Sequence, residues 1–153
     1  TMHAGSVDAA IHRLESEPLN VPRNMVQALD IITVQALIYH GTARVRRIEE
    51  IVEVAGIDPA TGNLRVNNVF VYDPVKDRLS FTGRSRVLSD IAGRRGWTSD
   101  QIEGELRIRR QVLEAMQQQG MYDYISVASI VHIFHIDRQK VIGNIADLKR
   151  VIR

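Results

Sequence analysis

The feature that most constrains this fold is a change in the period of apolar residues near Gly83. Before it, residues 31–39 and 44–55 are dense in β-branched side chains, and Gly41 separates the two runs. This pattern favours two adjacent antiparallel strands. After Gly83, apolar residues recur every three or four positions, which is the helical period. The order predicts a mixed α/β chain of the α+β type, an antiparallel β-meander followed by a C-terminal helical bundle.

Two aspartate-proline turns frame the rest of the predicted sheet. They occupy residues 58–62 and 73–77, and both hold residue types that favour turns. The strand between them places apolar side chains on one face, since alternate residues of a strand share a face: Leu64, Val66, Phe70 and Tyr72. Residues 78–81 supply a last short strand, so the meander has about four strands.

Short helices are predicted before the sheet. Residues 6–15 carry apolar side chains at helical spacing, and Ser6 is a suitable N-cap. A second short helix covers residues 23–29.

About four helices are predicted after the sheet. The first ends at Gly96, and a capping box from Thr98 to Gln101 opens a long helix that runs to Gly120. The residues expected to face inward from that long helix are Ile102, Leu106, Leu113 and Met116. Residues 124–136 are so apolar that a buried helix is expected, although a strand is the alternative. Asp137 is expected to cap a last helix with the inward face Val141, Ile142, Ile145, Leu148 and Ile152.

Composition narrows the classes of function. The 153 residues are 44% hydrophobic and 25% charged, which is enough to form a sizeable core. The net charge is only +2, and nearly all basic residues are arginine, which favours fixed ion pairs and anion contacts. Cysteine is absent, so disulfides, cysteine zinc sites and thiol catalysis are excluded, and a cytoplasmic location is expected. Because the chain opens on Thr1 with no apolar leader, we expect a piece of a longer protein.

His3 is the first candidate for chemistry. It is followed by the small residues Ala4 and Gly5 and by a helix start at Ser6, a setting in which backbone amides attract phosphate. An imidazole there could contact a phosphate or an attacking water. The alternative is a terminal residue of no functional consequence, and composition alone favours that alternative.

Other charged groups invite structural explanations. The arginine clusters could grip nucleic acid phosphates: Arg44, Arg46, Arg47, Arg84, Arg86, Arg94, Arg95, Arg107, Arg109 and Arg110. Acidic residues interleave with them and no aromatic stacking pattern accompanies them, so ion pairs or subunit contacts are favoured and nucleic acid binding is not expected. His132 and His135 are three residues apart, but no cysteine or glutamate stands at ligand spacing, and we predict no metal site.

Several segments carry a resemblance to a known family. Thr1-Met2-His3-Ala4-Gly5-Ser6, Arg13-Leu14 and Pro18-Leu19-Asn20-Val21-Pro22 resemble the histidine-box region of archaeal type II and type IV secretion ATPases, which include pilus and archaellum assembly motors. The resemblance continues in order through residues 28–30, 45–48, 53–59, 69–74, 93–96 and 109–113. It therefore spans essentially the whole chain.

The resemblance implies a hexameric, RecA-like motor that couples ATP hydrolysis to protein export or filament assembly. In this division, residues 1–40 end the ATPase core, 41–83 form the meander and 84–153 form a C-terminal helical subdomain. It assigns His3 to the histidine box near the terminal phosphate of ATP, with Thr1 in the same box. Arg13 is a candidate for nucleotide or intersubunit contact, although a surface ion pair is the more common role for such an arginine.

The same resemblance implies ATP and magnesium as cofactors of the parent protein, and a membrane platform protein as partner at the inner face of the membrane. No G-x-x-x-x-G-K-[ST] motif occurs in the chain, so we expect no tight nucleotide binding and no ATP hydrolysis by this chain alone. The alternative function is a basic adaptor that binds nucleic acid or protein without catalysis.

Overall fold

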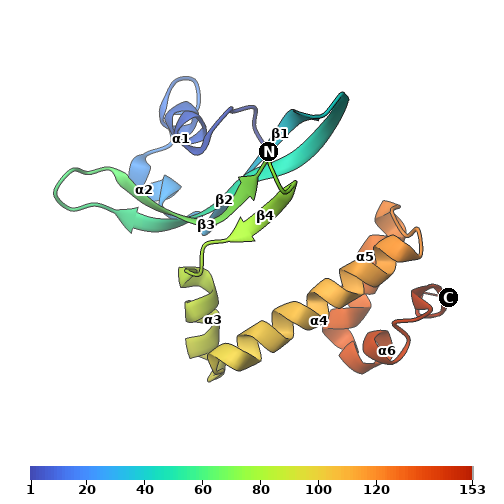
Figure 1. Ribbon diagram of the computed structural model, residues 1–153. Coiled ribbons are helices and arrows are strands. Elements are labelled where there is room, and N and C mark those ends of the chain that lie inside the picture. The colour runs from blue at the N-terminus through green and yellow to red at the C-terminus, as the bar shows by residue number, and fades with distance from the viewer. Residues whose placement is uncertain (153) are drawn as a thin grey trace. The chain divides into compact units, whose positions relative to one another are not determined.

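The computed structural model describes residues 1–152. They form two compact units, which divide between Gly93 and Arg94 (Figure 1). The first unit contains an antiparallel sheet and the second contains helices, so the mixed α/β order is confirmed. Among the residues described, none of the helices is both long enough and apolar enough to cross a bilayer.

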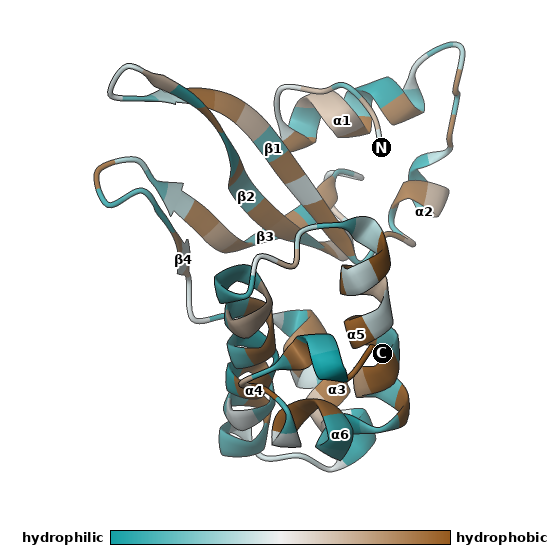
Figure 2. Ribbon diagram, turned by 90° about the vertical axis from the view of Figure 1, so that its right-hand side faces the viewer, coloured by the Kyte–Doolittle hydropathy of each residue, from teal (hydrophilic) through white to brown (hydrophobic). Residues whose placement is uncertain are grey.

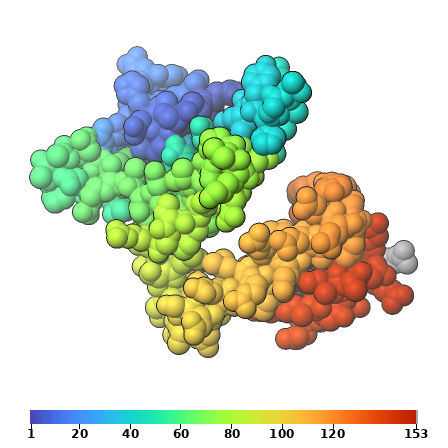
Figure 3. Space-filling view, viewed as in Figure 1, coloured from blue at the N-terminus to red at the C-terminus, as the bar shows by residue number. Residues whose placement is uncertain are grey.

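The sheet unit is a four-stranded meander with the strand order β1-β2-β3-β4. Its elements, in chain order, are α1 (Val7–Glu15), α2 (Arg23–Val26), β1 (Ile31–His40), β2 (Ala43–Ile57), β3 (Leu64–Asp73) and β4 (Arg78–Phe81). The helix expected at residues 23–29 ends earlier, at Val26, because the chain turns out of the helix before it enters β1. The β1–β2 hairpin projects from the unit, drawn in cyan in Figure 3.

The centre of β2 is covered on both faces. Val52 packs with Val34 of β1 and with Val7 of α1, so α1 lies on one face of the sheet. The next residue, Glu53, points to the opposite face, because successive side chains of a strand alternate. It is also buried, and it contacts the start of α3 (Arg86–Arg95). Figure 1 shows α1 and α3 on opposite sides of the sheet.

The apolar face expected for β3 is incorrect in part. Val66, which was expected on that face, is 40% exposed. Val69, which alternation assigns to the other face, is buried. The register against β2 explains the difference: Ile51 faces Phe70 but Val52 faces Asn68, so Val69 is the extra residue of a β-bulge. A bulge interrupts the alternation of side chains, and no turn residue marks this one in the sequence.

The helical unit follows the predicted boundaries closely at its start. It contains α4 (Ser99–Gln118), α5 (Tyr124–Ile136), α6 (Arg138–Gly143) and the short 3-10 helix η1 (Leu148–Arg150). The capping box is confirmed: the Gln101 backbone N–H donates to the Thr98 hydroxyl over 3.3 Å, and the Thr98 N–H donates to the Gln101 side chain over 2.8 Å. Asp137 caps α6 by accepting a hydrogen bond from the Lys140 backbone N–H.

Three expectations about this unit are wrong in detail. Leu106 and Leu113 are 44% and 57% exposed rather than inward, whereas Ile102 and Met116 are buried as expected and Val112 is a buried residue that the prediction omitted. The helix α5 is not buried as a whole, since only Ile130 and Phe134 are buried along it. The last predicted helix ends at Gly143, and Leu148 reaches the core from η1 instead. The side chain of Glu105 is only 12% exposed, so it lies on the covered side of α4. A prediction based on apolar residues alone does not identify it.

Candidate functional site

The segment before α1 leads directly into a capped helix start. Ser6 has extended backbone angles, and its hydroxyl accepts a hydrogen bond from the Ala9 backbone N–H at 3.1 Å. Val7 and Ala10 of the same helix are buried, which fixes α1 to the sheet. The residues ahead of Ser6 are therefore held at the positive end of an anchored helix.

The structure brings His3 and Arg13 together. The Arg13 guanidinium Nη1 donates a hydrogen bond to the His3 main-chain oxygen at 3.0 Å, across ten residues of sequence. Both side chains are exposed. The contact holds the His3 main chain from the last turn of α1, so the Arg13 guanidinium lies beside the segment that leads into the same helix. Asp8, in the first turn of α1, is the acidic residue of that helix N-terminus.

Thr1 lies apart from that contact, in a groove of about 500 Å³ beside β1. One wall is formed by the opening segment and α1, including Met2, Ala10 and Leu14. The other wall is the first half of β1, from Ile31 to Gln35. His3 and Arg13 do not line this groove, so the structure joins two of the three candidate residues and places the third next to the edge strand.

A second set of contacts ties the helices to the sheet at the β2–β3 turn. The carboxylate of Glu15 accepts two hydrogen bonds from Arg23, at 2.5 and 2.6 Å, and this pairing holds the pKa of Glu15 below its ordinary value. Arg23 also donates to the Gly62 main-chain oxygen at 2.9 Å. No local sequence pattern predicts this pair, because its two residues are eight positions apart with two prolines between them.

Glu53 is the most deeply buried charged residue among those described, with 2% of its surface exposed. Its carboxylate accepts hydrogen bonds from the Ser85 hydroxyl and from the backbone N–H groups of Arg86, at 2.6 Å, and Val87, at 3.2 Å. Burial alone would raise the pKa of Glu53, but these hydrogen bonds together hold the pKa below its ordinary value. Glu53 therefore caps α3 from the sheet.

A third cluster closes the β3–β4 turn. Arg47 of β2 makes two hydrogen bonds of 2.7 Å to the Asp77 carboxylate, and the Tyr72 hydroxyl donates to the same carboxylate at 2.7 Å. The bonds from Arg47 and then Tyr72 hold the pKa of Asp77 far below its usual range. For Arg47, this pairing confirms the expected ion pair, although its acidic partner was not foreseen.

Comparisons with known proteins find segments similar to this chain within longer archaeal proteins. No family model matches it. It is similar to three proteins of Methanocaldococcus jannaschii that are themselves named as uncharacterized. MJ0900 is 34% identical over 139 residues, covering 88% of this chain and 25% of that protein. MJ1287 is 38% identical over 114 residues, covering 74% and 42%, and MJ0781 is 28% identical over 145 residues, covering 95% and 20%.

The chain thus spans between about a fifth and two-fifths of the relatives it matches. The matches to MJ0900 and MJ0781 each cover at least 88% of the chain, so both structural units have counterparts in those two proteins. The names of the three relatives assign no activity, substrate or partner.

Proposed function

We propose that this chain is the C-terminal portion of a hexameric, RecA-like secretion or filament-assembly ATPase, with His3 positioned toward the terminal phosphate of ATP. The chain's share of the work is mechanical coupling between nucleotide turnover and a membrane platform protein. The phosphate-binding loop and the acidic magnesium ligands belong to another part of the parent protein.

The contact between Arg13 and His3 is the observation that carries this proposal. It brings the Arg13 guanidinium to the main chain of His3, three residues before the capped start of α1. The guanidinium and the helix start each attract an anion, although Asp8 opposes them in part. Arg13 uses one nitrogen on the His3 main chain, and the other donors of its fork can reach a phosphate.

The groove beside β1 supports the same proposal. A motor core is built around a larger sheet, and β1 offers an uncharged, apolar edge with Thr1 alongside it. The exposed side chains there include Leu29 and Ile31. An additional strand of the parent protein would cover these side chains and satisfy the outer backbone groups of β1.

The first experiment is calorimetry with magnesium and ATP on two proteins: this chain alone, and the chain joined to an upstream segment that carries a phosphate-binding loop. We expect ATP binding and hydrolysis only by the longer protein. Comparable binding by the chain alone would mean that a complete nucleotide site exists within it, and the proposal would fail.

The second experiment tests His3 within the longer protein. We expect His3→Ala to lower the ATP hydrolysis rate by about 100-fold, because the loss of one hydrogen-bond donor to a reacting group typically costs about that much. ATP affinity should stay within a few-fold of the wild-type value. The matched control is His12→Ala, which removes the imidazole of a histidine that lies within α1. Equal rates for the two variants would remove His3 from the site.

A binding module without catalysis is the second candidate, and the β1–β2 hairpin is the feature that favours it. There the Arg44 guanidinium lies 5.8 Å from the centre of the exposed Tyr39 ring, a pairing that can stack on a base. Binding to single-stranded nucleic acid with a steep salt dependence, lost in Tyr39→Ala, would support this candidate.

A further inference from the structure

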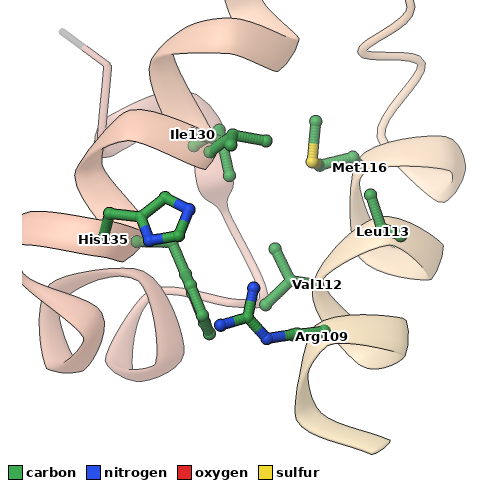
Figure 4. A pocket seen from close by; sticks show the side chains of 8 residues that line it. Arg109, Val112, Leu113, Met116, Ile130 and His135 are labelled. Carbon is green, nitrogen blue, oxygen red and sulfur yellow. The ribbon is translucent and has the colours of Figure 1, made fainter. Parts of the chain in front are cut away.

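An apolar groove lies between α4 and α5, within the helical unit (Figure 4). Its lining consists of Arg109, Val112, Leu113, Met116, Ile130, Val131, Phe134 and His135. Its volume is about 210 Å³. Pockets that enclose drug-sized ligands usually exceed about 300 Å³, so this groove suits side chains of a larger partner better than a whole small molecule.

The apolar surface continues beyond the groove. Val112, Met116 and Ile130 form its buried floor, whereas Leu113 and Val131 are exposed at its rim. The helix α5 is apolar along most of its length, as Figure 2 shows in brown. A row of exposed apolar side chains continuous with a groove is typical of a protein docking surface.

One end of the groove carries excess positive charge. Glu105 shares its carboxylate between two guanidinium groups, Arg109 at 2.8 Å and Arg138 at 2.5 Å. Both guanidinium groups also lie over the Phe134 ring, at 5.3 and 5.5 Å from its centre. One carboxylate cannot neutralise two guanidinium groups, and His135 adds a third basic side chain at the same end, as Figure 4 shows beside Arg109.

The lining residues also define a direction. Along α4 they fall at Arg109, Leu113 and Met116, which is the spacing of successive helical turns. The contact between Arg109 and Phe134 sets the basic end of α4 beside the C-terminal half of α5, so the groove has a basic end and an apolar end. Its complement is an amphipathic helix with apolar residues on one stripe and a carboxylate near one end.

We propose that this groove docks an amphipathic, acidic helix of a protein partner. Apolar side chains at positions i, i+3 or i+4, and i+7 of that helix fill the groove between α4 and α5, and an Asp or Glu meets Arg109 and His135. The proposal rests on the helical unit alone and does not depend on the proposed ATPase function.

The test uses two synthetic 18-residue helical peptides that share one leucine stripe and differ only at the end of the stripe, where one carries two Glu and the other two Lys. Binding to the full chain is measured by fluorescence anisotropy. We expect the Glu peptide to bind at least tenfold more tightly than the Lys peptide, since like-charge contact at the basic end opposes the latter.

Three variants locate the binding. We expect Arg109→Met, which keeps an apolar stem, to remove most of the preference for the Glu peptide, and Leu113→Asp to abolish binding of both peptides. Arg110→Met is the matched control, because Arg110 is 79% exposed, pairs with Glu114 and does not line the groove. Circular dichroism melts of each variant separate a lost contact from a lost fold.

Each contrary result overturns the proposal. Equal binding of the two peptides, or equal effects of Arg109→Met and Arg110→Met, removes the acidic helix as occupant. Self-association of the chain that Leu113→Asp abolishes assigns the groove to a second copy instead. Displacement of the Glu peptide by octanoate with an affinity equal to that of the peptide assigns it to a small amphiphile.

Discussion

Replacing the buried carboxylate of Glu53 by an amide tests how the sheet holds the start of α3. One oxygen accepts hydrogen bonds from the Ser85 hydroxyl and the Val87 N–H, and the other accepts one from the Arg86 N–H. In Glu53→Gln, the amide oxygen can keep the first two, but the amide NH₂ then faces the Arg86 N–H, donor against donor. A hydrogen bond to a charged group contributes about 1.5–3 kcal/mol, so we expect the free energy of unfolding to fall by about 2–3 kcal/mol.

The assay is urea unfolding at pH 7, followed by circular dichroism, together with hydrogen exchange of peptides from α3. Glu49→Gln is the matched control, because Glu49 is exposed on the same strand. We expect that control to change the free energy of unfolding by less than about 0.5 kcal/mol. An equally small change in Glu53→Gln would refute the argument.

The same variant carries a pH signature. The folded pKa of Glu53 is below its ordinary value, so its contribution is fully present above the unfolded pKa of about 4.3 and is lost as pH falls through the folded pKa. The difference in stability between the wild type and Glu53→Gln should therefore shrink between pH 6 and pH 2. A constant difference over that range would contradict the charged-cap explanation.

Three further changes test the core, a cap and a turn. Ile130→Ala removes side-chain volume at a fully buried position and should lower the free energy of unfolding by about 3 kcal/mol in urea titration. Thr98→Ala breaks the capping box and should cost about 1 kcal/mol, with faster hydrogen exchange in the first turn of α4. Asp77→Asn keeps a residue that tolerates the positive φ of 46° but loses the charge, so residues 73–78 should exchange faster than in the wild type. Because the folded pKa of Asp77 is depressed by Arg47 and Tyr72, wild-type protection of this turn should persist below pH 4, where free aspartates protonate.

Local sequence patterns predicted the helices and strands of this fold better than they predicted which side chains are buried. The meander, the Ser6 cap and the capping box at Thr98 each depend on residues within a few positions of one another, and all appear as expected. The bulge at Val69 depends on pairing with a distant strand and has no local signal. Along α4, Ile102 and Met116 are buried as expected, but Leu106 and Leu113 are exposed. The side chain of Glu105 is only 12% exposed, because it pairs with Arg109 and with Arg138 of α6, a contact between helices that has no local signal.

The candidate site shows the same division. His3 and Arg13 were selected separately, and only the folded α1 brings them together. Glu53 and Asp77 were missed because their partners lie 30 or more residues away in the chain. For Asp77, the local sequence offers only the neighbouring Arg78 as an ion-pair partner. The partner in the structure is Arg47, which lies 30 residues earlier in the chain.

The outer edge of β1 has a practical consequence for handling this protein. Residues 31–40 include no Asp, Glu, Lys, Arg or Pro, and among the residues described no strand pairs with their outer side. Natural sheets usually protect such an edge with a charge or a proline, since a bare edge can template cross-β assembly. The bulge opposite Val34 and Gln35 has its extra residue, Glu49, on β2 rather than on β1. Storage at high concentration should therefore favour fibrillar aggregates that start at β1, and a single lysine in place of exposed Leu37 should suppress them.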